Sequence, residues 1–166
     1  MVILFAIATY LALLVQTAVP LWFPFRALIP NLIIILTVDL GLRHHGALAA
    51  LIAFGIGYAT DAMSGTTLGM NAFLTTAVFL LTYELSSRLL VTNALLGAIA
   101  VFFAVILAGF GAIVIISGRG AGAAINGALP NLALQALISA IVAPLIFAIM
   151  AGSKRIVGLP DRVERE

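Results

Sequence analysis

Asp61 is the residue whose type and position most clearly suggest chemistry, because this carboxylate stands at the end of a long apolar stretch. Ser64 follows three residues later, directly before Gly65. An ionisable side chain in a membrane segment is costly unless another group satisfies it, so it is a candidate functional residue by default. No Lys or Arg lies between Arg43 and Arg88. Asp61 must therefore use backbone N–H groups, hydroxyls, water or another helix.

Hydrolytic chemistry is the first function class to weigh. An intramembrane aspartyl protease needs two opposed carboxylates that share a proton. Asp39 and Glu84 each precede an arginine by four residues, an order that favours neutralisation on a helix surface, so Asp61 is left alone. A serine protease would need a base beside Ser64, but both histidines fall at the opposite membrane face. We expect no enzymatic activity, no metal and no cofactor.

Two interpretations of Asp61 stay open. In the first, its carboxylate accepts hydrogen bonds from the turn that runs from Gly65 to Gly69 and fixes two helices relative to each other. Ser64 or one of the threonines after it would then cap a helix that starts near Leu68. In the second, Asp61 serves a partner or a ligand directly.

The composition places this turn in an integral membrane protein. The chain has 166 residues, of which 64% are hydrophobic and 8% charged, whereas a soluble domain has about 25% charged residues. A span needs ~20 apolar residues, so the length accommodates about six spans and leaves no room for a soluble domain. Cysteine is absent, which excludes disulfides and thiolate metal sites. A net charge of +2 gives no support for nucleic-acid binding.

The hydrophobic stretches predict a single polytopic domain with an all-α fold. We expect six transmembrane helices over residues 2–19, 30–42, 47–63, 68–85, 94–116 and 130–152, followed by a short cytoplasmic tail over residues 153–166. Pro20 is expected to end the first helix. The second stretch is about 20 Å long at 1.5 Å per residue, which is less than the ~30 Å hydrocarbon core. This helix must be sunken, or it must thin the bilayer.

Two similar motifs stand where the second and sixth helices are predicted to start. They are Pro30 with Asn31, and Pro130 with Asn131. Proline suits the first turn of a helix, because the N–H group that it lacks would be unpaired there anyway.

Basic residues predict the orientation. The rule that cytoplasmic loops are enriched in Lys and Arg favours cytoplasmic termini and puts the turn after Asp61 on the outer face. In this orientation the outer side carries only Arg26 and Arg119. The inner side carries Arg43, Arg88, Lys154, Arg155, Arg162 and Arg165.

Small residues recur at four-residue steps on two of the predicted helices. They are Ala49, Ala53 and Gly57 on the third helix, and Ala100, Ala104 and Ala108 on the fifth. Small side chains let another helix approach closely in lipid. We treat both faces as candidates for helix packing or for binding a partner helix.

The sequence resembles the MreD family of rod shape-determining proteins over nearly its whole length. The resemblance rests on Pro30-Asn31 with the apolar run after it, on Asp61-x-x-Ser64-Gly65-x-x-Leu68-Gly69, and on residues 126–147. It implies a non-enzymatic scaffold in the bacterial inner membrane that helps to organise peptidoglycan synthesis during cell elongation. The implied partners are the bitopic protein MreC and, indirectly, the actin-like MreB and the peptidoglycan polymerase and transpeptidase. A homo-oligomer also stays open.

The resemblance also suggests an alternative function. The fold of this family is similar to that of the substrate-binding subunits of energy-coupling-factor transporters, which bind vitamins. Those subunits dock through an alanine face, and Ala8 and Ala12 match it. A vitamin site needs polar and aromatic groups that converge on an outer pocket. The outer turns offer few such groups beyond Trp22, Asp61 and Asn126.

Overall fold

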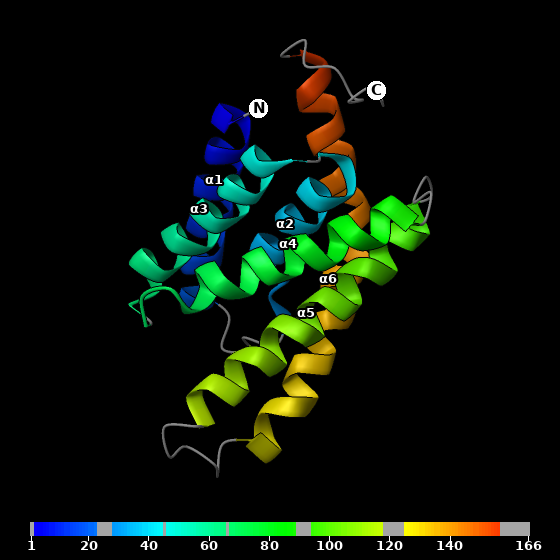
Figure 1. Ribbon diagram of the computed structural model, residues 1–166. Coiled ribbons are helices and arrows are strands. Elements are labelled where there is room, and N and C mark those ends of the chain that lie inside the picture. The colour runs from blue at the N-terminus through cyan, green and yellow to red at the C-terminus, as the bar shows by residue number, and fades with distance from the viewer. Residues whose placement is uncertain are drawn as a thin grey trace.

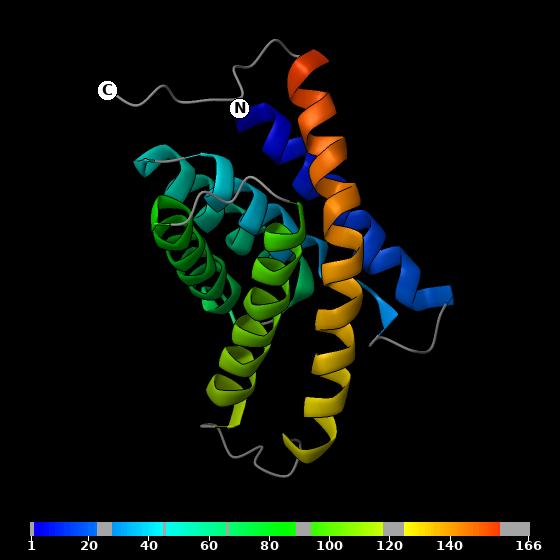
Figure 2. The ribbon, with the colours of Figure 1, turned by 90° about the vertical axis from the view of Figure 1, so that its right-hand side faces the viewer.

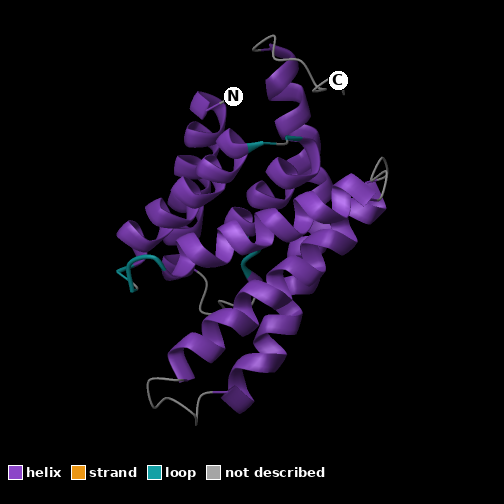
Figure 3. Ribbon diagram, viewed as in Figure 1, coloured by secondary structure: helices purple, strands orange, loops and turns teal. Residues whose placement is uncertain are grey.

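The computed structural model describes residues 2–22, 28–44, 46–65, 67–88, 94–117 and 125–156. These residues form six helices joined by short connections (Figure 3). The prediction of an all-α fold with six helices is confirmed. The helices are α1 (Val2–Trp22), α2 (Leu32–Arg43), α3 (Ala47–Ser64), α4 (Met70–Arg88), α5 (Ala94–Ser117) and α6 (Ile125–Ile156).

Helix α2 lies at the centre of the bundle and contacts all five other helices. Around it, α3 packs chiefly on α4, and α5 packs chiefly on α6. Helix α1 lies beside α3, and α1 begins at the same end of the bundle as α6 ends (Figure 1). Figure 2 shows the long α6 running beside α5.

The central position of α2 explains its composition. Every residue from Ile33 to Gly41 is buried, so the helix has no polar stripe and is apolar almost all round. One of its sides joins a hydrophobic cluster with α1 and α3, to which Phe5 contributes, and the other side joins a cluster with α5 and α6. A helix of 12 residues is about 18 Å long, so α2 is short, as its sequence predicts.

Helices α1 and α6 differ from their predicted bounds. Pro20 does not end α1, which continues to Trp22. Helix α6 starts at Ile125, so Pro130 and Asn131 lie inside it, and the prediction that they start a helix is wrong. A proline inside a membrane helix is tolerated, because neighbouring helices and local adjustments satisfy the backbone group that it frees.

Within the described part of the chain, three helices are long and apolar enough to cross a membrane. These stretches are Ala47–Ser64, Leu95–Ile115 and Ala128–Ser153, and α1 adds a shorter apolar stretch, Val2–Ala18. The apolar helices indicate a multi-pass membrane protein. Six complete crossings stay a prediction, because neither α2 nor α4 meets these criteria on its own.

Candidate functional site

Asp61 joins the end of α3 to the start of α4. Its side chain is 1% exposed. Oδ2 accepts hydrogen bonds from the N–H groups of Gly69 and Ala72 at 2.9 and 3.1 Å. Oδ1 accepts from the backbone N–H and the side-chain amide of Asn71 at 3.1 and 2.9 Å. The first N–H groups of a helix have no partner within the helix, and its dipole favours a carboxylate there. Asp61 therefore accepts hydrogen bonds from the turn after it and fixes α3 relative to α4, as the first interpretation predicts.

Two glycines shape the turn between α3 and α4. Gly65 and Gly69 have φ values of +63° and +93°, in the left-handed region that favours glycine. Gly65 ends α3, and Gly69 turns its N–H group to the carboxylate of Asp61. Leu68 lies between them and is 67% exposed, so it does not hold the turn together. The first turn of α4 starts at Met70, and there Asp61 accepts hydrogen bonds from the backbone N–H groups of Asn71 and Ala72.

A second capping arrangement stands at the start of α2, where Pro30 and Asn31 precede the helix as predicted. Oδ1 of Asn31 accepts a hydrogen bond from the N–H of Ile34 at 3.2 Å, and Asn31 is the N-cap. The backbone N–H of Asn31 donates to the hydroxyl of Ser139 on α6 at 2.9 Å. Non-helical backbone at membrane depth persists only where other parts of the protein satisfy its polar groups. Ser139 thus ties the start of α2 to α6.

Two glutamines complete this arrangement. The side-chain amide of Gln16 on α1 donates to the carbonyl of Pro30 at 3.3 Å, and that of Gln135 on α6 donates to the carbonyl of Ile29 at 3.2 Å. Sequence reasoning missed both side chains. Each is an uncharged amide inside an apolar stretch, and such residues often hydrogen-bond between membrane helices. That signal could have found them.

Replacing Ser139 with alanine is expected to lower the free energy of unfolding by about 2 kcal/mol, because it leaves the N–H of Asn31 without its partner. The change can be measured by thermal unfolding of the purified protein in detergent. Ser153→Ala is the matched control, since the half-buried Ser153 donates to the carbonyl of Ile149 in its own helix and, among the described residues, ties no other helix. Equal stability of the two variants would contradict the assigned role of Ser139.

A cavity of about 660 Å³ lies between the two capping arrangements, and all six helices contribute to its lining. It lies towards the ends of α1, α3 and α5 and the starts of α2, α4 and α6. None of the described residues that line it is charged. Its polar lining residues are Gln16, Thr17, Asn31, Thr60, Ser64, Asn71, Thr75 and Gln135.

The polar groups that the sequence suggested for an outer pocket are placed differently. Asp61 does not line the cavity, but holds Asn71, which does. The side chains of Trp22 and Asn126 lie outside the described part of the structure. The cavity therefore takes its polar groups from the helices and from Asn31, the N-cap of α2.

The small-residue face of α3 packs against α4. Ala49, Ala53 and Gly57 are buried, and the hydroxyl of Thr75 donates to the carbonyl of Ala53 at 3.0 Å. A Cβ atom added at Gly57 would lie 2.5 Å from the Cα of Ala72, closer than atoms can approach. This face is occupied within the chain and leaves no room for a partner helix.

The small-residue face of α5 packs largely against α6, and Ala100 and Ala104 also line a groove between α4 and α5. Ala104 and Ala108 belong to a buried cluster with Ala136 and Ala143 of α6, and Ala100 packs against this cluster. Close approach of α5 and α6 accounts for the small side chains.

Asp39 and Arg43 form the predicted pair on α2, with 2.7 Å between Oδ1 and Nε. Asp39 is completely buried, whereas the Arg43 side chain is one-third exposed. The guanidinium lies 6.0 Å from the centre of the Phe147 ring on α6. The pair is therefore anchored on α6 near the end of α2. Glu84 is exposed, and the side chain of its predicted partner, Arg88, lies outside the described residues.

The fold and the site define a class: a multi-pass helical membrane protein in which buried polar side chains cap helices around an uncharged cavity. The family model described as rod shape-determining protein MreD matches residues 1–152, and the chain belongs to this family. Membership implies a role in determining rod shape. Comparisons with curated proteins and with solved structures found no match. The suggested similarity to transporter subunits therefore gains no support from these comparisons.

Proposed function

We propose that this protein is a non-enzymatic subunit of the bacterial cell-elongation machinery, and that it binds the transmembrane helix of MreC in the groove between α1 and α3. It lies in the inner membrane with both termini in the cytoplasm. Through MreC it acts indirectly on MreB and on the peptidoglycan polymerase and transpeptidase. Family membership supports the role in rod shape, and the groove supports the place of contact.

The groove between α1 and α3 has the size and surface to accept a few side chains from one face of a helix. Its volume is about 440 Å³, and its lining is almost wholly apolar. Gly55 and Ala59 lie along its α3 wall, and Ala6 lies on the α1 wall. Such small side chains let the backbone of a partner helix come close, which is how helices associate in lipid.

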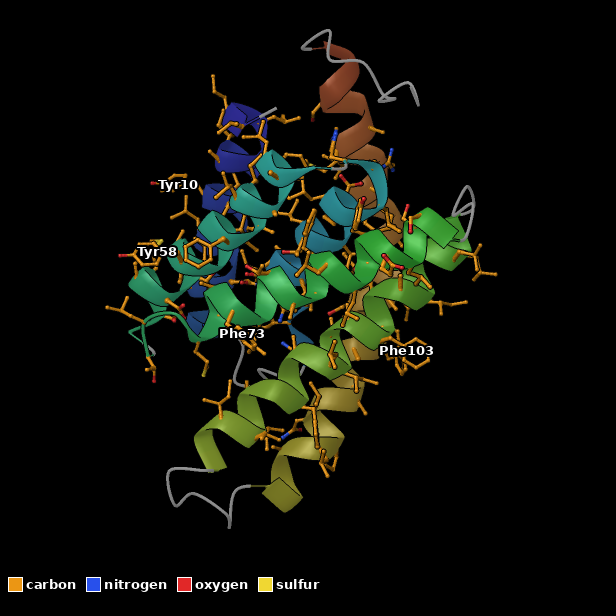
Figure 4. The ribbon with its side chains drawn as sticks, viewed as in Figure 1. Tyr10, Tyr58, Phe73 and Phe103 are labelled. Carbon is orange, nitrogen blue, oxygen red and sulfur yellow. The ribbon has the colours of Figure 1, made fainter. Side chains whose placement is uncertain are left out.

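Two tyrosines beside this groove carry the proposal. Tyr10 on α1 is 58% exposed and lines the groove, and Tyr58 on α3 is 51% exposed. Both project from the same side of the molecule, away from the other helices, whereas Phe103 projects from the opposite side (Figure 4). Neither hydroxyl makes a hydrogen bond to another residue in the part of the chain that the structure describes.

The depth of these tyrosines makes their exposure informative. Tyr10 is two residues from the middle of α1, and Tyr58 is less than three from the middle of α3. Each Cα therefore lies within about 4 Å of its helix midpoint. Tyrosine prefers the headgroup region, about 15 Å from the bilayer centre. In the proposed placement, with α1 and α3 each centred in the bilayer, neither hydroxyl reaches that region.

A partner helix that offers hydrogen-bond acceptors would remove the free-energy cost of leaving these hydroxyls unpaired in lipid. A hydroxyl without a hydrogen-bond partner in hydrocarbon costs about 2 kcal/mol or more. Lipid acyl chains offer no acceptor, but a transmembrane helix offers polar side chains and, at small residues, backbone carbonyls. The groove between α4 and α5 presents no polar group that needs a partner among its described lining residues. Its single polar lining residue, Thr82, already donates a hydrogen bond to the carbonyl of Val78 at 2.7 Å.

The double variant Tyr10→Phe, Tyr58→Phe is expected to recover about tenfold less MreC at an unchanged membrane level, because two hydrogen bonds are lost and little shape changes. Co-purification with tagged MreC measures this recovery. Gly55→Leu should abolish recovery by filling the groove, since a Cβ at Gly55 meets no atom within 4 Å and the fold tolerates it.

The matched control is Gly152→Leu. A Cβ at Gly152 also meets no atom within 4 Å, but this residue lies on α6, away from the groove. It should keep full MreC recovery. If the tyrosine variant and Gly55→Leu both keep full recovery at normal abundance, MreC does not bind in this groove.

The alternative function, vitamin binding for an energy-coupling-factor transporter, has one observation in its favour, the polar cavity. No observation supports the alanine face through which such a subunit would dock. Ala12 is 5% exposed and belongs to the cluster that joins α1 to α2 and α3, and Ala8 packs against this cluster. We therefore separate the question of a ligand in the cavity from transport.

A further inference from the structure

We infer that the cavity between the two capping arrangements binds an uncharged ligand group that donates hydrogen bonds, such as the hydroxyls of a sugar. This site is distinct from the groove proposed for MreC. The inference depends on which atoms of the lining are already used and which are open.

The two glutamines present acceptors. Gln16 and Gln135 each use the side-chain NH₂ group to donate to a backbone carbonyl, which fixes the orientation of the amide. Their Oε1 atoms accept no hydrogen bond from the described residues. Neither Oε1 is among the buried atoms that lack a partner, so both atoms are exposed, and both side chains line the cavity.

Two threonines add further acceptors. Thr17 donates its hydroxyl proton to the carbonyl of Leu13 at 2.9 Å, and Thr60 donates to the carbonyl of Ile56 at 2.9 Å. A hydroxyl that has given its proton still accepts through its lone pairs. The lining therefore offers four acceptors from these side chains beside one amide donor, the NH₂ group of Asn31, so a matching ligand must supply chiefly O–H or N–H donors.

Charge and size narrow the ligand class. Among the described residues, the lining has no cation for a phosphate or carboxylate and no anion for an ammonium group. The nearby carboxylate of Asp61 already accepts four hydrogen bonds. A charged group would lose hydration without a compensating partner. The volume of about 660 Å³ falls within the roughly 300–1,000 Å³ of small-molecule sites.

A sugar group could come from a free sugar or from the headgroup of a glycolipid, and two probes separate these sources. Glucose carries hydroxyl donors without charge, and monoglucosyldiacylglycerol carries the same sugar on a lipid. Native mass spectrometry of the full chain, released from detergent with each probe, counts bound molecules. Phosphatidylcholine, whose headgroup has no donor, is the lipid control.

Variants locate the binding. Thr60→Val keeps the shape but removes one acceptor, and it should weaken binding about fivefold. Thr76→Val is its matched control, because Thr76 donates to the carbonyl of Ala72 in the same manner but does not line the cavity. Ala112→Leu fills space on the α5 wall and should abolish binding.

Binding of either probe to the wild type and to Thr76→Val, with loss in Ala112→Leu, is the expected result. The probe that binds identifies the source. The inference is overturned if neither probe binds, if phosphatidylcholine binds as well as the glycolipid, or if Ala112→Leu binds as the wild type does.

Discussion

Replacing Asp61 with alanine is expected to lower the free energy of unfolding by about 4 kcal/mol, the largest loss for any single side chain considered. The change removes the acceptor of four hydrogen bonds and leaves the start of α4 without its cap inside the bundle. Thermal unfolding in detergent and the membrane level of the protein both measure this loss. The stability of Asp61→Asn should lie between those of the wild type and Asp61→Ala. The amide can still accept through its oxygen, but its NH₂ group would face the N–H donors of Gly69 and Ala72.

Asp39→Ala is the control for Asp61→Ala. It also removes a completely buried carboxylate, but the partner that it leaves, Arg43, is one-third exposed and can reach water. The free energy of unfolding should therefore fall by roughly half as much. If the two alanine variants are equally stable, the capping of α4 by Asp61 does not have the importance given to it here.

Gly57→Ala is expected to cost about 3 kcal/mol or more in stability and to reduce the folded protein in membranes strongly. A single methyl group at this position meets the backbone of α4, at the Cα of Ala72 and at the carbonyl oxygen of Asn71, and backbone cannot move aside as a flexible side chain can. Helices α3 and α4 would have to separate along their main contact.

Gly55→Ala provides the control on the same helix. The exposed Gly55 lies two residues earlier, and a methyl group there meets no atom within 4 Å. Because alanine is also the better helix former, this variant should be as stable as the wild type or slightly more stable. Similar membrane levels of the Gly57→Ala and Gly55→Ala proteins would mean that the close α3–α4 contact is wrong.

Local patterns predicted much of this fold. Six apolar stretches correspond to six helices, and the spacing of Asp39 and Arg43 predicted their ion pair. Asp61 was recognised because an isolated carboxylate in an apolar context needs partners. The sequence also predicts that Ser64, Thr66 or Thr67 caps the new helix, and the described contacts show the carboxylate of Asp61 capping α4. Asp61 caps α4 from eight residues before Gly69, which requires the folded hairpin of α3 and α4.

Long-range contacts account for what the sequence did not predict. Pro30-Asn31 and Pro130-Asn131 are the same local signal, yet only the first pair starts a helix. The first is held by Gln16, Gln135 and Ser139, which meet it only in the folded bundle. The small-residue faces were ambiguous for a related reason. In lipid, a face that meets a helix of the same chain and one that meets a partner have the same composition.

The central position of α2 has a consequence for the biogenesis of the protein. Its residues from Ile33 to Gly41 are covered partly by α5 and α6, which the ribosome makes last. Buried Asp39 and the non-helical backbone before Leu32 would meet lipid or water in any shorter nascent chain. The amino-terminal half therefore cannot complete its core during translation. Assembly in the membrane must finish with the arrival of the α5–α6 hairpin, which closes over a segment inserted long before.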